Sequence, residues 1–348
     1  MPPADAAQPA DAATSANAEV RERLARFVAS RLPAGAEVAI GPVQRVAVGL
    51  SRENWVFDAT WSEGGPAGEA RSRPLIARRD PPGGLLDTDR RTEFEILRAV
   101  EGSSIPAPRA LWLDPDGSEL GRPTLVMERG TGSCDYFVLN GALPLERRQR
   151  MAERFCDLLA DIHLTDWAAL GVDATLVDPG RDAATVALDH WVGVLRQDQV
   201  EPLPELELVI DWLRSHAPPS TRTVLLHGDF KAGNMLLDDD DRVVLLLDWE
   251  LAHLGDPHDD LGWITQPLRT REHLIAGHWE VADLLGRYSV RTGFDVDAEA
   301  LRWWNAMACF KTAVMQVTGL ASYLSGRTDT MYRLANGCVL AAFDLIGL

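Results

Sequence analysis

The chain has 348 residues, of which 46% are hydrophobic and 25% charged, a composition typical of a globular protein long enough for two domains. Its net charge of −18 at pH 7 argues against nucleic acid or an anionic membrane as the main partner, because both are bound by basic surfaces. No segment approaches the roughly 18 consecutive apolar residues that a membrane-spanning helix needs. The four cysteines are scattered without the spacing of a metal site, which is typical of free thiols in a reducing cytoplasm, so we expect a cytoplasmic protein.

The first third of the chain predicts a small lobe in which strands dominate. Residues 1–18 are rich in Ala, Pro and Asp and predict a disordered tail, so the N-lobe is expected over residues 19–130. Periodicity and turn residues predict, in chain order, a helix at Glu19–Leu32, strands within Val43–Trp61, a glycine-rich turn at Ser62–Ala70, a strand at Pro74–Arg79, a helix at Asp89–Val100 and short strands at Leu111–Leu113 and Thr124–Met127.

Helical periodicity dominates from Leu145 onward, where Met151, Phe155, Leu158 and Ile162 fall on one stripe. Further helices are predicted at Ala184–Leu195, Leu206–Ser215, Ala282–Arg291 and Leu301–Tyr323, around a compact strand region at Val224–Glu250. We therefore expect an α+β protein of two lobes that join near residues 128–132, with a larger, mainly helical C-lobe over residues 131–348.

The strongest chemical signal is the segment that begins at Val224, which predicts a strand, a loop and a second strand. The loop presents an acid, an amine and an amide within six positions, as Asp229, Lys231 and Asn234. A run of four aspartates follows and predicts a solvated hairpin turn, after which a buried strand ends in Asp248. Because a hairpin folds its two strands together, Asp248 is expected to lie close to the loop.

Phosphoryl transfer needs a cluster of this kind. A carboxylate orients the attacking hydroxyl and accepts its proton, while carboxylate and amide oxygens hold Mg²⁺ on the phosphate oxygens. We assign Asp229 as the catalytic base and Asn234 and Asp248 as the metal ligands. Each residue taken singly is better explained by capping a turn or ending a strand. The combination of both spacings with the flanking strands favours the catalytic interpretation.

The pattern His227-Gly228-Asp229, then Asn234, then a strand ending in Asp248-Trp249-Glu250 resembles the phosphotransferase family of aminoglycoside, choline and homoserine kinases. The longer string from Asp248 to Trp263 is most similar to the kinase-like domains fused to some acyl-CoA dehydrogenases and to their free-standing bacterial relatives. The resemblance covers about residues 40–325. It implies a two-lobed protein-kinase-like fold, ATP and Mg²⁺ as cofactors and a small-molecule hydroxyl as acceptor.

In the C-lobe the resemblance places the base and the metal ligands on the same three residues. It implies that His227 supports the loop through hydrogen bonds, and that Asp256 and Asp260 tie the loop to the following helix. Lys231 falls where protein kinases carry a lysine that contacts phosphate, so it is either a contact to the γ-phosphate or an exposed lysine on a loop.

In the N-lobe the resemblance requires a cation on the third strand to hold the α- and β-phosphates. The chain has only two lysines, Lys231 and Lys311, and neither is in this lobe. Arg78 takes the position, with Arg79 as the alternative since the register is uncertain by one residue. Glu93 would be the ion-pair partner of this arginine, unless it is a surface glutamate.

Two further segments complete the expected nucleotide site. The loop Gly49–Asn54 would cover the phosphates, with Ser51 and Asn54 as candidate contacts, although it has one glycine and is no glycine-rich loop. The segment Val126–Gly130 matches the family hinge, where backbone groups of Glu128 and Gly130 would bind adenine, or it is only a strand end.

Other sites are poorly supported. His253, Asp256 and His258 do not have the spacing of a zinc site, and the tryptophans are expected to pack in the core rather than to form a cation–π wall. The expected function is therefore transfer of the γ-phosphoryl of ATP to a hydroxyl of a small molecule, such as a hydroxyacyl-CoA or hydroxy acid. The alternatives are an aminoglycoside or macrolide kinase, or a catalytically silent nucleotide-binding relative, and the presence of Asp229, Asn234 and Asp248 argues against the silent relative.

Overall fold

The computed structural model describes residues 9–46, 53–62, 70–81, 88–332 and 336–348. The chain divides into two compact units. The first consists of residues Met1–Pro81 and Pro108–Gly130, and the second of Pro82–Ala107 and Thr131–Leu348. Along the chain, the boundary between residues 130 and 131 falls where the sequence predicts the junction of the lobes. The segment 82–107, which was expected in the N-lobe, groups with the second unit.

The first unit is an antiparallel sheet with one long helix. Its elements are α1 (Pro9–Ser30), β1 (Val38–Ile40), β2 (Gln44–Val46), β3 (Glu53–Ser62), β4 (Ala70–Arg79), β5 (Ala110–Asp114) and β6 (Thr124–Glu128). The strand order is β1-β3-β4-β6-β5, and β2 also pairs with β3. β3 and β4 pair along their whole lengths, so that Asn54 stands opposite Arg78.

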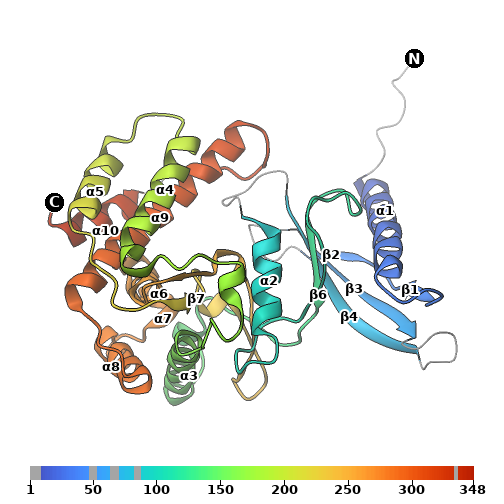
Figure 1. Cartoon of the computed structure of the whole chain (residues 1–348), viewed down its shortest axis with the longest axis horizontal. Helices are drawn as coiled ribbons and strands as arrows, with labels where there is room; N and C mark the ends of the chain where they lie inside the picture. The colour runs from blue at the N-terminus through green and yellow to red at the C-terminus, as the bar shows by residue number, and fades with distance from the viewer. Residues whose placement is uncertain (1–8, 47–52, 63–69, 82–87, 333–335) are drawn as a thin grey trace. The chain divides into compact units, whose positions relative to one another are not determined.

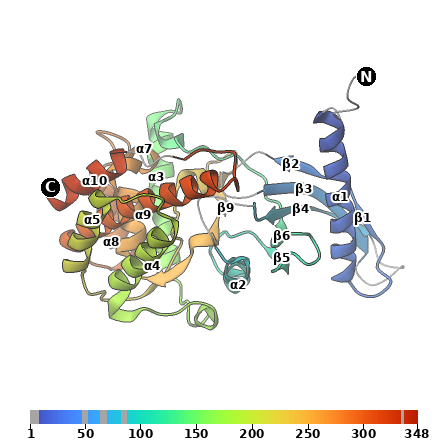
Figure 2. The ribbon, with the colours of Figure 1, turned by 90° about the horizontal axis from the view of Figure 1, so that it is seen from above.

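Alternation of side chains explains how this sheet packs. Trp55, Phe57, Ala59 and Trp61 are buried on one face of β3, and this face contacts buried side chains of α1, which runs along the sheet (Figure 2). The prediction of a tail over residues 1–18 is wrong for its second half, because α1 begins at Pro9. The alanines that suggested disorder are the best helix formers, and proline is favoured in the first turn of a helix.

The second unit contains most of the helices. Its elements are α2 (Arg90–Val100), α3 (Leu145–His163), α4 (Ala183–Asp198), α5 (Pro204–Ser215), β7 (Val224–Leu226), β8 (Met235–Leu237), β9 (Val243–Leu246), β10 (His253–Gly255), α6 (His258–Thr265), α7 (Thr270–His273), α8 (Val281–Thr292), α9 (Ala298–Leu324) and α10 (Asn336–Ile346). α9 is the central helix and packs against α4, α5, α6 and α10 (Figure 1). No helix in the described ranges is both long and apolar enough to span a membrane.

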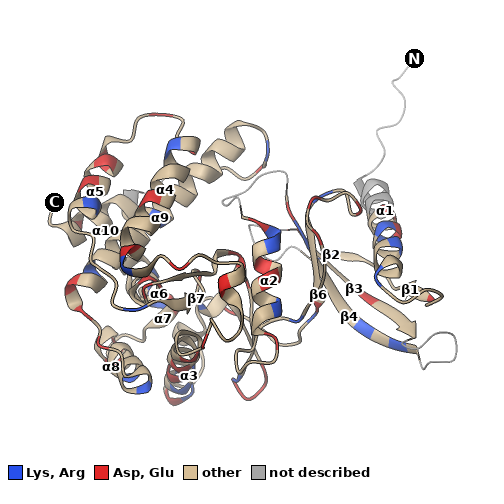
Figure 3. Cartoon of the chain, viewed as in Figure 1, with Lys and Arg blue, Asp and Glu red and all other residues tan. Residues whose placement is uncertain are grey.

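Two small antiparallel pairs lie inside this helical unit, β7 with β10 and β8 with β9. The predicted aspartate turn is confirmed, because it connects β8 to β9 and Asp238 accepts hydrogen bonds from the N–H groups of Asp240 and Arg242. α3 packs against α8, and Arg287 and Arg291 of α8 form ion pairs with Asp157 and Asp161 of α3. Figure 3 shows where basic and acidic residues lie along the helices. The strand-rich first unit and mainly helical second unit confirm the predicted α+β class.

Candidate active site

The loop that the sequence predicts to be catalytic, residues 227–234 and called the catalytic loop below, connects β7 to β8. Its second residue can only be glycine. Gly228 has φ +77°, and a Cβ at this position would lie 2.3 Å from the carbonyl oxygen of Leu251. The backbone therefore turns sharply, and closely against its neighbour, directly before Asp229.

Asp260 of α6 holds the peptide N–H groups at this turn. Its buried carboxylate accepts hydrogen bonds from the N–H groups of His227, at 2.8 Å, and Gly228, at 2.9 Å. Nε2 of His163 lies 3.3 Å from the same carboxylate. Burial would raise the pKa of Asp260, but the interactions with His163 and His227 outweigh it, so the pKa lies well below its usual range. Asp260 is therefore an ionised anchor for the loop.

The His227 ring braces the loop from inside. Its Nε2 is 2.9 Å from the carbonyl oxygen of Leu247, and its Nδ1 accepts the N–H of Asp229 at 3.2 Å. Burial lowers the pKa of His227, although nearby carboxylates oppose the shift. These contacts fit the neutral ring with its proton on Nε2. The ring also packs against Trp249, with 4.9 Å between centroids.

The acid, amine and amide predicted from the sequence come together. The ammonium of Lys231 lies 2.5 Å from Oδ2 of Asp229. Nδ2 of Asn234 donates to the backbone carbonyl of Asp229 at 3.0 Å and to its Oδ2 at 3.2 Å. Burial would lower the pKa of Lys231, but the charges of Asp229 and Asp248 help to raise it above its usual value. Lys231 is thus held as a cation beside two acids, and it is not an exposed loop lysine.

Asp248 follows β9, and the N–H of Leu247 donates to the carbonyl oxygen of Asn234 at 2.7 Å. This backbone bond brings the two predicted metal ligands side by side. Asp248 adopts a left-handed conformation with φ 71°, which is uncommon for a residue other than glycine and recurs at functional sites. Since Nδ2 of Asn234 is engaged with Asp229, its Oδ1 is the atom suited to a metal.

The donor chemistry fits Mg²⁺. Mg²⁺ prefers oxygen ligands and commonly takes one or two from the protein, with the remainder from phosphates and water. An amide oxygen and a carboxylate provide such a pair here. Throughout the described ranges, no group of three or more His, Cys, Asp and Glu side chains is arranged to hold a metal ion. His253 instead lies 3.1 Å from Asp259, and His258 lies 2.6 Å from Asp256.

A buried ionic group that the sequence did not predict stands next to this centre. Arg90 of α2 pairs with Glu93, and its other nitrogen lies 2.9 Å from Glu250, two residues after Asp248. All three side chains are almost completely buried. Glu93 is therefore no surface glutamate. No local pattern could have indicated this contact, because Arg90 and Glu250 lie 160 residues apart.

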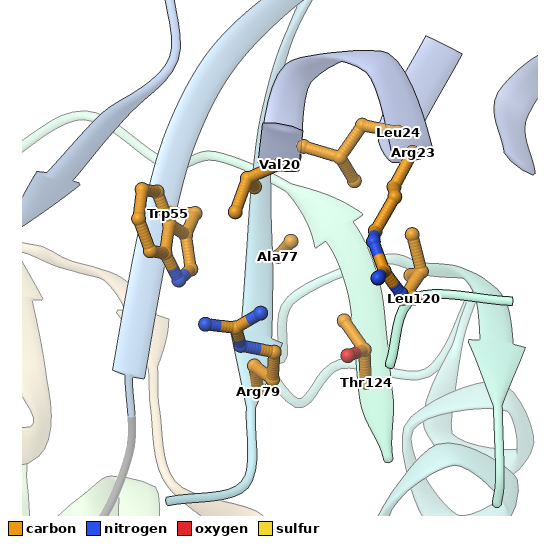
Figure 4. Close-up of a pocket in the computed structure, with 8 residues that line it drawn as sticks. All are labelled: Val20, Arg23, Leu24, Trp55, Ala77, Arg79, Leu120 and Thr124. Carbon is orange, nitrogen blue, oxygen red and sulfur yellow. The ribbon is translucent and has the colours of Figure 1, made fainter. Parts of the chain in front are cut away.

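The predicted residues of the first unit that the structure describes lie on β3, on β4, at the end of β6 and directly after it. Ser51 lies outside the described residues. Asn54 and Arg78 are register partners on adjacent strands. Arg79 belongs to the other face of β4, where it donates to Glu53 at 2.7 Å and lines a small pocket with Trp55 and with residues of α1 (Figure 4).

Two backbone N–H groups of the expected hinge, residues 126–130, already donate hydrogen bonds within the first unit. The N–H of Glu128 donates to the carbonyl oxygen of Arg109, and the N–H of Arg129 donates to that of Pro74. The carboxylate of Glu128 lies near Arg73 and Arg109. A contact to adenine would therefore have to use other backbone groups of residues 128–130, including those of Gly130.

Lys311 of α9 also contacts the loop, because its Nζ donates a hydrogen bond of 2.7 Å to the carbonyl oxygen of Gly228, and no motif in the sequence pointed to it. One signal was present for Lys311, because it is the only Asp, Glu, Lys or Arg between Arg302 and Arg327. A single charge in the middle of a long apolar helix is a candidate for a buried, functional group.

Known proteins resemble this chain in sequence and in structure. Acyl-CoA dehydrogenase family member 11 of Rattus norvegicus is 26% identical over 275 residues, which cover 74% of this chain and 35% of the rat protein. The chain spans about a third or less of the length of such curated relatives. A Ralstonia eutropha protein provisionally named an aminoglycoside phosphotransferase superposes with a TM-score of 0.69 at 19% identity, covering 94% of this chain and 98% of that chain.

An aminoglycoside kinase solved with bound ligands has the same fold. The complex of APH(2'')-IIa with streptomycin and ATP gives a TM-score of 0.54 at 15% identity, with 91% of each chain covered. These likenesses confirm the predicted kinase-like fold. A model of the phosphotransferase enzyme family matches residues 44–304, which is well over half of the sequence. The chain therefore belongs to the phosphotransferase enzyme family.

Proposed function

We propose that this protein is an ATP- and Mg²⁺-dependent small-molecule kinase that transfers the γ-phosphoryl of ATP to a hydroxyl group. The observation that carries the proposal is the cluster of Asp229, Lys231 and Asn234 in one buried loop, with Asp248 joined to it through the backbone. A catalytically silent relative would have no need to keep a base, a cation and two metal ligands together.

Each residue of the cluster has a role in the proposed reaction. Asp229 accepts the proton of the acceptor hydroxyl, whose oxygen forms a bond to the γ-phosphorus while the bond from that phosphorus to the β–γ bridging oxygen breaks and ADP leaves. Lys231 places a positive charge beside the transferred group. Asn234 and Asp248 would hold Mg²⁺, which when bound neutralises charge on the phosphate oxygens.

The nucleotide contacts proposed in the first unit begin with Arg78. Arg79 is committed to Glu53 and to the face of the sheet that α1 covers, so Arg78 is the arginine whose side chain leaves β4 on the other face. This alternation supports Arg78 as the anchor for the α- and β-phosphates. Ser51 and Asn54 for the phosphates and Glu128 and Gly130 for adenine stay predictions, as does the pairing of Glu93 with the anchor.

We propose a hydroxyacyl-CoA or a related hydroxy acid as the acceptor. Support comes from the sequence similarity to acyl-CoA dehydrogenase family members, which covers 74% of this chain for the rat protein. The aminoglycoside kinases among the structural neighbours support the fold alone at 14–22% identity, so an antibiotic acceptor is the second choice.

The test is ADP release from ATP over an acceptor panel of hydroxyacyl-CoAs, free hydroxy acids, aminoglycosides and macrolides, with Asp229→Asn as the blank. We expect one class to raise turnover above the acceptor-free rate. Asp229→Asn should lower kcat by about 10²–10⁴-fold, the usual contribution of a positioned base, while calorimetry finds ATP–Mg²⁺ affinity unchanged. Turnover of the variant at the wild-type rate, or no turnover by wild type with any acceptor, would contradict the proposed function.

A further inference from the structure

Lys311 of α9 is a buried ammonium that contacts the catalytic loop. Its side chain is only 4% exposed, and its Nζ donates a hydrogen bond of 2.7 Å to the carbonyl oxygen of Gly228. The ring of Trp263 lies 4.5 Å from Nζ, and that of Trp191 lies 5.5 Å away. Among the residues that the structure describes, no carboxylate is within ion-pair distance of this ammonium.

The carbonyl that Lys311 holds belongs to the peptide group that joins Gly228 to Asp229. The N–H at the other end of the same peptide group donates to Nδ1 of His227 at 3.2 Å. The preceding peptide N–H groups are both taken by Asp260. The carbonyl of this peptide group is therefore held by Lys311 of α9, its N–H by the His227 ring, and the two preceding N–H groups by Asp260 of α6.

Burying the Lys311 ammonium lowers the folding stability, and a purely structural role does not explain why a lysine stands here. Moving an ammonium out of water is unfavourable, and an apolar residue of similar volume often gives equal or greater stability at such a site. Burial lowers the pKa of Lys311, while the negative charges of Asp259, Asp229 and Asp260 partly oppose the shift. A charge-assisted bond to a carbonyl is, however, stronger and more directional than a neutral one. The lysine thus fixes the orientation of one peptide group, although an apolar residue would leave the protein equally or more stable.

We propose that Lys311 is a positioning residue that fixes the Gly228–Asp229 peptide plane and so aims the Asp229 carboxylate at the acceptor hydroxyl. The aiming role rests on the proposed kinase function. The fixing of the peptide plane does not, and it can be measured without any acceptor.

The sequence offers a direct spectroscopic test. Only two Gly-Asp pairs occur in the chain, Gly228–Asp229 and Gly255–Asp256. Protein labelled with ¹³C at glycine carbonyls and ¹⁵N at aspartate amides therefore gives two cross-peaks, and Asp229→Asn assigns them by removing one. Lys311→Met keeps the length and volume of the side chain and removes the donor. It should move the Gly228 carbonyl signal upfield and leave the Gly255 signal in place as an internal control.

Kinetic measurements separate an effect of Lys311 on the position of Asp229 from an effect on the stability of the protein. Lys311→Met should lower kcat at least tenfold, with the Kd for ATP–Mg²⁺ unchanged within about twofold and a Tm at or above that of wild type. Met307→Ala is the matched control. It opens a cavity one turn earlier on the same helix, in the core formed with α4, α5 and α10, so it should lower Tm but not kcat at a temperature where it is folded.

Each outcome decides a separate point. An unmoved Gly228 signal in Lys311→Met overturns the fixing of the peptide plane. A shifted signal with wild-type kcat overturns the aiming role. If Lys311→Met does not fold, Lys311→Arg replaces it, because arginine keeps a donor and a charge. The proposal is then overturned if the Gly228 carbonyl signal of Lys311→Arg is shifted upfield from its wild-type, hydrogen-bonded position while kcat is unimpaired. Absence of wild-type turnover with every acceptor removes the proposed function and the aiming role together, whereas the two carbonyl signals still report whether Lys311 holds the loop.

Discussion

Replacing Asp260 by asparagine tests how the catalytic loop is held. The buried carboxylate accepts two backbone N–H groups and faces His163. Asparagine has nearly the same shape but only one acceptor oxygen, so one of these donors must face an NH₂ group. The charge that interacts with His163 is lost as well.

The expected loss of unfolding free energy follows from these contacts. A hydrogen bond to a charged group contributes about 1.5–3 kcal/mol, and a buried donor left without a partner costs about 1–3 kcal/mol. One bond lost and one donor left without a partner together give about 2.5–6 kcal/mol, a large part of the roughly 5–15 kcal/mol by which a domain is stable. The pKa of Asp260 is depressed in the folded state, so this contribution is fully present above the unfolded-state value of about 3.9 and is lost as pH falls below it.

Urea unfolding at pH 7 measures the loss, and Asp259→Asn is the control. Asp259 precedes Asp260 on the same helix but contacts His253, whose side chain is 38% exposed, so its replacement should cost about 1 kcal/mol. Asp260→Asn should also lower kcat at temperatures where it is folded, because the backbone before Asp229 is no longer fixed. A loss below about 1 kcal/mol, or a loss equal to that of the control, would show that Asp260 does not anchor the loop.

Three further changes test other parts of the structure. Asp248→Asn should remove most of the Mg²⁺-dependent gain in nucleotide affinity, and calorimetry with and without Mg²⁺ would contradict the metal assignment if that gain persisted at an unchanged Tm. Arg78→Ala should raise the KM for ATP more than Arg79→Ala, and the reverse order would mean that the wrong face of β4 binds phosphate. Burial, with nearby cations, lowers the pKa of His273 to about 3, so this ring is neutral when folded but takes up a proton below about 6.5 when unfolded. Its contribution to stability is thus present above that pH and is lost as pH falls, and His273→Leu should remove about 2 kcal/mol of the stability change that urea unfolding measures between pH 7 and pH 5.

Local spacing was enough to predict which residues of the candidate site come together. Asp229, Lys231 and Asn234 lie within one loop, and Asp248 is brought back by a hairpin whose turn is visible as four consecutive aspartates. Short-range geometry of this kind depends on backbone rules that a sequence displays directly. The same holds for the strands β3 and β4 and for the helices with an amphipathic stripe.

The elements that the sequence did not predict are those without such periodicity. All eight residues of α6 are buried, so the helix has no polar face to produce a repeating pattern. α10 is also mainly apolar, and β10 has only three residues. The ion pair of Arg90 with Glu250 spans 160 residues, and the hydrogen bond of Lys311 to the carbonyl oxygen of Gly228 spans 83. Contacts at that separation are decided by how helices pack, which no local pattern encodes.

The packing of α6 against α9 connects the loop, which local spacing predicts, with the long-range contacts, which it does not. A Cβ on Gly262 of α6 would lie 2.7 Å from the backbone of Trp304 on α9, so glycine at this position lets the helices approach closely. α6 carries Asp260, which binds the N–H groups of the loop, and α9 carries Lys311, which binds its carbonyl. The loop itself has little regular structure, yet its polar backbone atoms are bonded to side chains from two helices that are fixed against each other. The helical core therefore holds the backbone that precedes Asp229, while Lys231 and Asn234 of the loop contact its carboxylate directly.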